Sequence, residues 1–132
     1  MKQPAATTLV TLETVFKALA DKTRLRALAL LGGNEVCVCH IHDTLRLPQP
    51  TVSRHLSYLR RAGLVDARRD GVWIHYRVSA SLDPVVRAVI DAAVHAVTHA
   101  PTAHKDRRQF EKSFGEGRQP EARQVVPCCA PR

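Results

Sequence analysis

A β-hairpin that follows directly on an amphipathic helix constrains the fold of this chain more than any other feature. Two runs rich in β-prone residues, 64–68 and 72–78, are separated by Arg69-Asp70-Gly71. Asp-Gly between two such runs is a strong hairpin signal. Gly63 stands just before the first run and suits the left-handed residue that ends a helix. The sequence therefore predicts a helix that leads straight into a two-stranded antiparallel hairpin.

Apolar residues at helical spacing mark the rest of the domain. The pattern i, i+3, i+4 runs through residues 10–31, and Asp21 interrupts it as the cap of a second helix. Leu47-Pro48 ends a short helix, because the residue before a proline avoids the helical region, and Pro50 is tolerated in the first turn of the next helix. Five helices are expected: two within residues 10–31, and one each over about 38–45, 49–63 and 82–98.

This order of elements is that of a winged helix-turn-helix. The expected fold class is α+β and mostly α, with about five helices and a β-hairpin wing. The domain is predicted to occupy residues 1–100. Residues 101–132 hold four of the eight prolines and few large apolar side chains, so they are expected to form a mostly disordered basic tail.

The positive charge of the chain is concentrated in one part of this layout. The net charge is +8 over 132 residues, the length of one ordinary domain. Residues 46–77 contain seven basic and two acidic side chains and carry +5, residues 101–132 carry +3, and the remainder of residues 1–100 is neutral. A helix fits the major groove of DNA and a hairpin can lie along the adjacent backbone. Double-stranded DNA is therefore the expected partner.

Several other classes of protein are disfavoured. No run approaches the roughly 20 apolar residues of a membrane span, and the first residues lack the apolar core of a secretory signal. We therefore expect a cytoplasmic protein with reduced cysteines and no membrane contact. A thiol enzyme remains an alternative, but the chain has no glycine-rich nucleotide motif and no Cys-x-x-Cys. No enzymatic activity and no catalytic cofactor are expected.

Three blocks of sequence resemble the ArsR/SmtB family of metalloregulatory repressors. They are VFKALAD and TRL within residues 15–25, QPTVSRHLSYLRRAGLV at 49–65 and RRDGVWIHYRV at 68–78. The resemblance covers roughly residues 11–98. It implies a homodimer assembled through the first and last helices, which binds an inverted-repeat operator when metal-free and leaves the DNA when an inducer binds.

The resemblance also implies which residues contact DNA. Base contacts fall at the N-terminal end of the helix over 49–63, on Gln49, Ser53 and Arg54, with Thr51 on the same polar side. Pro50 stands where the family usually has a serine-like residue, so one expected contact is missing. The hairpin arginines are expected to contact phosphates, which position the protein without specifying sequence; they are Arg68, Arg69 and Arg77.

Cys37 and Cys39 form the second informative motif. Reduced thiols at this spacing are candidate ligands for a soft metal. Residues i and i+2 of a helix point to different faces, so one ion holds both sulfurs only if the start of the helix is distorted. This helix is the first of the helix-turn-helix, and the helix over 49–63 is the second, the recognition helix. A distortion of the first would displace the second and make inducer binding and DNA binding mutually exclusive.

The motif resembles that of the arsenic-responsive members, in which a third cysteine follows three residues after the second. His42 occupies that position here, and trivalent arsenic and antimony favour thiolates over imidazole. We hypothesise that As(III) or Sb(III) is the inducer, and that Cys128 or Cys129, from the same or the other protomer, completes the site. Binding by two thiols alone, with an unrelated tail pair, remains the alternative.

Other signals remain open within the same fold. Cadmium and lead sensors add cysteines from the N-terminal arm, but residues 1–36 contain neither Cys nor His. A zinc site on the last helix would use Asp91, His95 and His99, with His104 beyond. In the zinc sensors of the family the aspartate lies two residues before the first histidine, whereas Asp91 lies four residues before His95. We therefore favour a solvated, histidine-rich helix end over a zinc site. A repressor that responds to thiol oxidation shares the DNA-binding half. His40 and His75 are expected to be surface residues.

Overall fold

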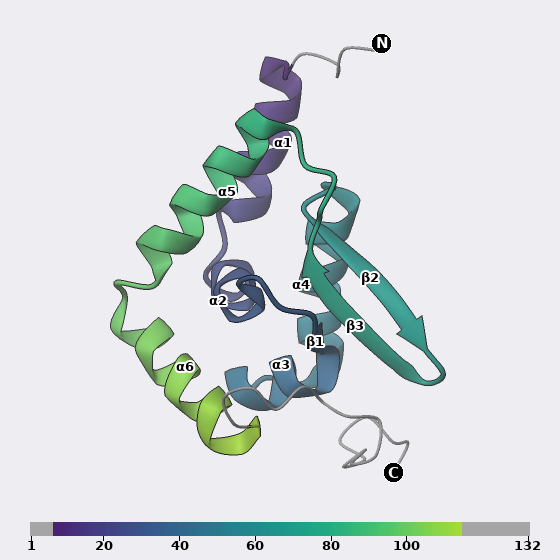
Figure 1. Ribbon diagram of the computed structural model, residues 1–132, viewed down its shortest axis with the longest axis vertical. Helices are drawn as coiled ribbons and strands as arrows, with labels where there is room; N and C mark the ends of the chain where they lie inside the picture. The colour runs from purple at the N-terminus through teal and green to yellow at the C-terminus, as the bar shows by residue number, and fades with distance from the viewer. Residues whose placement is uncertain (1–6, 115–132) are drawn as a thin grey trace.

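The computed structural model describes residues 7–114 as a bundle of helices with a β-hairpin that projects from one side (Figure 1). The elements in chain order are α1 (Leu9–Leu19), α2 (Lys22–Leu31), β1 (Val36–Cys37), α3 (Val38–Leu45), α4 (Gln49–Arg61), β2 (Val65–Asp70), β3 (Trp73–Val78), α5 (Pro84–Val97) and α6 (Pro101–Phe114). The predicted winged helix-turn-helix is confirmed: the five expected helices are α1 to α5, β2 and β3 form the hairpin wing, and α6 is an additional helix.

Local signals account for the boundaries of the first helices. The Asp21 carboxylate accepts hydrogen bonds from the backbone N–H groups of Thr23, at 2.8 Å, and Arg24, at 3.1 Å, and so begins α2. Gly32 ends that helix with a φ of +51°. Arg46 takes a left-handed conformation, with a φ of +56°, in the tight turn between α3 and α4. At each of these helix ends the chain changes direction, so the first four helices pack against one another.

The wing is a three-stranded antiparallel sheet in the order β1-β3-β2. β2 and β3 form the predicted hairpin, with Gly71 at a φ of +62° in its turn. β1 adds a third strand on the other side of β3, where Val36 pairs with Tyr76 and Cys37 pairs with His75. This strand escaped prediction, because two residues carry no measurable periodicity.

One hydrophobic core joins the helices to the base of the wing. Its fully buried side chains come from α1, α2, α3, α4, the start of β2 and α5, and include Val15, Leu28, Leu31, Ile41, Val52, Leu56, Leu59, Val65 and Ile90. The thiol pair and Tyr76 of β3 belong to the same core. Movement of β1 is therefore opposed by packing on several helices.

Residues 101–114 form helix α6, which packs on α2 and α3 (Figure 1). The expectation of a mostly disordered tail is wrong for these residues, and residues 115–132 lie outside the part that the structure describes. The error has a physical cause: Pro101 is the first residue of the helix, where its missing N–H costs nothing. Ala103, Asp106 and Phe110 then recur at helical spacing on the packed side.

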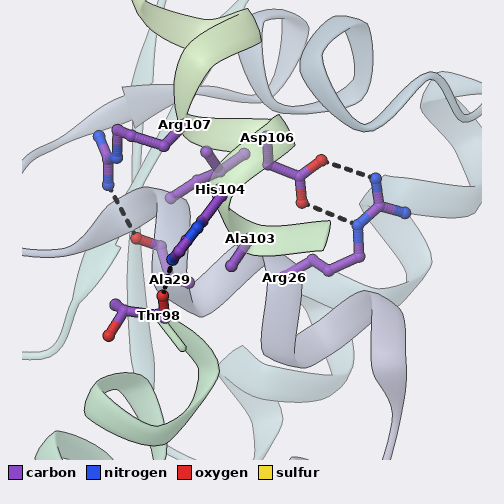
Figure 2. A pocket seen from close by; sticks show the side chains of 8 residues that line it. Arg26, Ala29, Thr98, Ala103, His104, Asp106 and Arg107 are labelled. Carbon is purple, nitrogen blue, oxygen red and sulfur yellow. Dashed lines mark hydrogen bonds and ion pairs between the residues drawn. The ribbon is translucent and has the colours of Figure 1, made fainter. Parts of the chain in front are cut away.

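An ion pair fastens α6 to α2. The Asp106 carboxylate accepts two hydrogen bonds from the Arg26 guanidinium, each 2.8 Å long, and Asp106 is only 5% exposed (Figure 2). Arg107 donates to the backbone carbonyl of Ala29 at 3.1 Å. Bidentate pairs of this kind are strong and directional. The ion pair therefore fixes the rotation of α6 as well as its position.

No helix within residues 7–114 combines the length and the hydropathy that crossing a bilayer requires.

Substitution of Asp106 should destabilise the protein. Asp106→Ala leaves the Arg26 side chain, which is 25% exposed, without its carboxylate partner, so we expect the free energy of unfolding to fall by about 2–3 kcal/mol. Urea denaturation measures this. Lys105→Ala, at an exposed position of the same helix, is the matched control and should change stability by less than about 0.5 kcal/mol. Equal stabilities of the two variants would contradict the prediction.

Candidate functional site

Helix α4 separates its apolar and polar residues onto opposite sides. Val52, Leu56 and Leu59 are fully buried and face the core. Among the predicted base-contacting residues, Gln49 and Arg54 are exposed, while Thr51 and Ser53 are half-buried. The Gln49 side-chain amide donates to the Ser53 hydroxyl at 2.9 Å, which orders both groups in the first turns of the helix. The structure therefore gathers the four predicted residues at the N-terminal end of α4.

Arg24 holds α4 against the first two helices. Its guanidinium donates to the backbone carbonyls of Ala18, at 2.6 Å, and Lys17, at 3.0 Å, and so satisfies the open end of α1. The same group lies 4.1 Å from the centre of the Tyr58 ring on α4, a cation–π contact. The sequence indicated Arg24 only as part of a motif. The structure makes it a positioning residue for the recognition helix.

The arginines of the wing differ in how well their charge is compensated. Arg68 donates from Nε to the Glu35 carboxylate at 3.0 Å, and this contact lowers the pKa of Glu35. Arg77 lies 3.9 Å from Asp66. Arg69 is exposed and has no ion pair within residues 7–114. Among these three arginines, Arg69 offers its charge most openly to a phosphate.

The Glu35–Arg68 pair was missed in the sequence, because 33 positions separate its members. A carboxylate whose pKa is lowered on folding adds stability above its unfolded-state pKa, and that contribution is lost as the pH falls through the lower folded-state value. At neutral pH the pair is therefore formed. It joins the segment just before β1 to strand β2 of the wing.

Cys37 and Cys39 lie with their Sγ atoms 2.9 Å apart. Cys37 is the N-cap of α3, in extended conformation with φ −66° and ψ 140°, and Cys39 lies in the first turn of the helix. Both are buried, at 3% and 2% exposure. The expectation that the two sulfurs diverge unless the helix start is distorted is wrong, because the helix begins between them. The fold itself brings the sulfurs together.

The thiol pair lies at the junction of the two elements predicted to contact DNA. Cys37 ends β1, whose backbone pairs with β3 of the wing opposite His75. Cys39 lies in the first turn of α3, which packs on the recognition helix α4. A ligand that moves either sulfur therefore acts on the wing and on the helix-turn-helix together.

The other candidate ligands are not brought together as one group in the part of the chain that the structure describes. Within residues 7–114 no three His, Cys, Asp or Glu side chains form a group that could hold a metal ion. The His95 and His99 rings are 4.9 Å apart, and His104 Nε2 lies 2.6 Å from the carbonyl of Thr98. His42 Nε2 is buried without a hydrogen-bond partner among the described residues. Cys128 and Cys129 lie outside those residues.

The two histidines that were expected at the surface are not simple surface residues. His40 and His75 are both half-buried, and the ring of His40 stacks on Phe114 of α6, with 3.9 Å between the ring centres and an angle of 23°. Burial, together with the nearby His75, lowers the pKa of His40. The sequence could not indicate this contact, because helix α6 was not expected.

A family model described as "Bacterial regulatory protein, arsR family" matches residues 21–67, from the cap of α2 through α4 into β2. The arsenic resistance transcriptional regulator ArsR1 of Pseudomonas putida is 43% identical over 93 residues, which are 70% of this chain and 70% of that protein. The chain belongs to the ArsR family. The arsenical resistance operon repressor of Escherichia coli is 44% identical to this ArsR-family protein over 80 residues, 60% of this chain and 68% of the relative.

Solved structures of similar proteins have the same fold. HlyU from Vibrio cholerae aligns with a TM-score of 0.60 at 32% identity, over 69% of this chain and 95% of HlyU. The homodimeric winged helix-turn-helix DNA-binding domain of Mb0332 from Mycobacterium bovis aligns with a TM-score of 0.56 at 30% identity, over 74% of this chain and 97% of that chain. This ArsR-family protein is thus a DNA-binding transcriptional regulator and not an enzyme.

The Glu35–Arg68 pair should reduce affinity for DNA, because the carboxylate competes with phosphates for Arg68 and adds negative charge to the wing. We expect Glu35→Gln to raise affinity for duplex DNA by about three- to tenfold at low salt. Glu13→Gln on α1 is the control, since it changes the net charge equally and removes only an exposed pair with Lys17. Fluorescence anisotropy at fixed salt measures both. An affinity of Glu35→Gln no higher than that of the control would contradict the prediction.

Proposed function

We propose that the protein is a repressor that binds an inverted-repeat operator as a homodimer and leaves it when trivalent arsenic or antimony binds cysteine thiolates. Cys37 and Cys39 supply the first two thiolates, and Cys128 or Cys129 supplies the third. Gln49, Thr51, Ser53 and Arg54 contact bases; Arg68, Arg69 and Arg77 contact phosphates. The names of the Pseudomonas and Escherichia relatives support the inducer.

The contact between the two sulfurs is the observation that carries this proposal. Soft ions select thiolates over oxygen ligands, and the pair is already assembled and shielded from water. An ion bonded to both sulfurs sets their separation and directions by its own bond lengths and angles. Binding therefore acts at once on Cys37 at the end of β1 and on Cys39 in the first turn of α3, and so disturbs both DNA-contacting elements.

Exposed apolar side chains support dimerisation through the first and last helices of the predicted domain. On α1, Leu9 is 84% exposed, Val10 75% and Phe16 55%, and on the adjoining α5 Val85 is 52% exposed. α1 and α5 lie side by side (Figure 1), so these residues are presented by two neighbouring helices. A second copy of the chain would cover this surface, as expected for a regulator of a palindromic site.

The same sulfur contact supports a second candidate signal. Two buried thiols this close could be joined by an oxidant into a disulfide, which would strain the start of α3 in a similar way. One measurement distinguishes the two candidate signals. Peroxide would release the DNA from an oxidation-sensing repressor, while arsenite would not.

Titration of arsenite into the protein–operator complex tests the proposed inducer. The wild-type protein should dissociate, while Cys37→Ser and Cys39→Ser should each need at least about a tenfold higher arsenite concentration, because each loses one of the bonds to arsenic. Anisotropy at constant salt is the measurement, since affinity for DNA depends steeply on salt. Cys128→Ala leaves Cys129 to supply the third thiolate, so this variant should release DNA at the wild-type arsenite concentration and shows that the loss of one thiol as such does not abolish the response. Normal release by both Cys37→Ser and Cys39→Ser would refute the proposed mechanism.

Substitution on α1 tests the dimer. Phe16→Asp places a charge on the exposed apolar surface, so we expect the dimer dissociation constant to rise by at least about tenfold and operator binding to weaken with it. Analytical ultracentrifugation measures the change. Val72→Asp, at a 65% exposed apolar residue in the turn of the wing, is the control and should remain dimeric. Equal dimerisation of Phe16→Asp and the control would exclude this surface.

A further inference from the structure

Helix α6 presents three basic side chains on one side. Lys105, Arg108 and Lys112 are all exposed, and they follow one another at i, i+3 and i+7, which places them on the same side of the helix. Ala103 and Asp106, the buried residues of α6, lie on the opposite side and pack on the domain. The three exposed cations are called the α6 basic face below.

The charge of the α6 basic face is not compensated. None of its three side chains forms an ion pair within residues 7–114. The helix has two carboxylates of its own. Asp106 is paired with Arg26 of α2, and Glu111 forms no ion pair in the same range. An exposed and unpaired cationic surface of this kind attracts an anionic partner.

Helix α6 reaches both ends of α3, the first helix of the helix-turn-helix. The Arg26 side chain, which binds Asp106, also donates to the backbone carbonyl of Leu45 at the C-terminal end of α3, at 3.4 Å. The ring of Phe114, the last residue of α6, stacks on His40 in the first turn of α3. α6 therefore runs beside α3 in the opposite direction, and its yellow-green end lies next to that helix (Figure 1).

This position brings α6 close to the expected path of the DNA backbone. The first helix of a helix-turn-helix crosses the backbone while the second enters the major groove, so a helix packed along α3 lies beside the same phosphates. Arg46, in the turn between α3 and α4, is also exposed and forms no ion pair within residues 7–114. Unpaired positive charge thus continues from the start of α4 through this turn to α6.

We propose that the α6 basic face binds backbone phosphates of double-stranded DNA beside the segment contacted by α4 and the wing. Two observations select this partner: the charge of the surface is complementary to phosphate, and the surface continues from the helix-turn-helix. The contact does not depend on DNA sequence, because phosphate contacts carry no base information. It goes beyond the proposed function, since it requires neither an inducer nor an inverted repeat.

The salt dependence of DNA binding tests the proposal. A mixed-sequence duplex of about 30 base pairs is a sufficient probe, because phosphate contacts form on any sequence. Each lost phosphate contact lowers the magnitude of the slope of log affinity against log salt by about 0.9. Arg108→Gln combined with Lys112→Gln should therefore lower it by about 2 and weaken binding at low salt by at least about tenfold. Fluorescence anisotropy over a salt series measures both quantities.

A variant with the same net charge is the control. Lys17→Gln combined with Lys22→Gln removes two exposed cations from α1 and α2, outside the elements predicted to contact DNA. Its affinity should fall by less than about twofold, through the change in overall charge alone. All four side chains are exposed, so both variants should keep the stability of the wild type. Equal slopes and affinities of the two variants would overturn the proposal, because the α6 cations would then act only through net charge.

Photocrosslinking locates the contact without relying on charge. Replacement of Lys112 by p-benzoylphenylalanine should give a crosslink to the duplex, whereas replacement of Lys22 by the same residue should not. The absence of a crosslink from position 112 would overturn the proposal.

Sedimentation of the Arg108→Gln, Lys112→Gln variant detects the alternative occupant of the surface. A changed oligomeric state together with wild-type DNA binding would assign the α6 basic face to a second copy of the chain, and would also overturn the proposal. None of these measurements uses arsenite, so a failure of the proposed inducer is distinguished from a failure of the α6 contact.

Discussion

The backbone pairing of β1 with β3 is the constraint on which the rest of this structure depends. Two residues, Val36 and Cys37, lengthen the wing by one short strand, and the chain enters α3 immediately afterwards. The wing and the helix-turn-helix therefore meet at this junction with no loop between β1 and α3. That junction is buried in the close-packed core. A shift of β1 therefore also moves the helices that pack on it.

The thiol pair occupies this junction and uses its geometry. Cys37 has an extended backbone and Cys39 has a helical backbone. Because the conformation changes between them, the two side chains point toward each other. Glu35, just before the strand, holds Arg68 of the wing. Within a few residues the chain thus places two adjacent thiols, a contact with the helix-turn-helix and an ion pair with a wing arginine. In the proposed function, an inducer bound to the thiols would act on the wing and on the recognition helix α4 through these direct contacts.

Much of the fold could be predicted because its signals are local. Apolar periodicity marks five helices, Asp21 and Pro50 mark helix starts, and Asp70-Gly71 marks the hairpin turn. The candidate DNA-contacting residues of α4 were implied by the resemblance to the ArsR/SmtB family, and their polar character at the start of that helix agrees with it. The prediction failed for α6, because several prolines and few large apolar residues are typical of a disordered segment, whereas Pro101 only begins a helix. That helix is stabilised by contacts with α2 and α3 that are distant in sequence.

The sequence by itself determined the class of protein: a winged helix-turn-helix with concentrated positive charge and a Cys-x-Cys motif, all of which arise from residue type and short-range spacing. Only the tertiary structure decided how the functional parts are joined. Strand β1, the Glu35–Arg68 pair, the Arg26–Asp106 pair and the His40–Phe114 stack each connect segments far apart in the chain. Pairings of this kind depend on which surfaces meet after folding, and no local pattern encodes them.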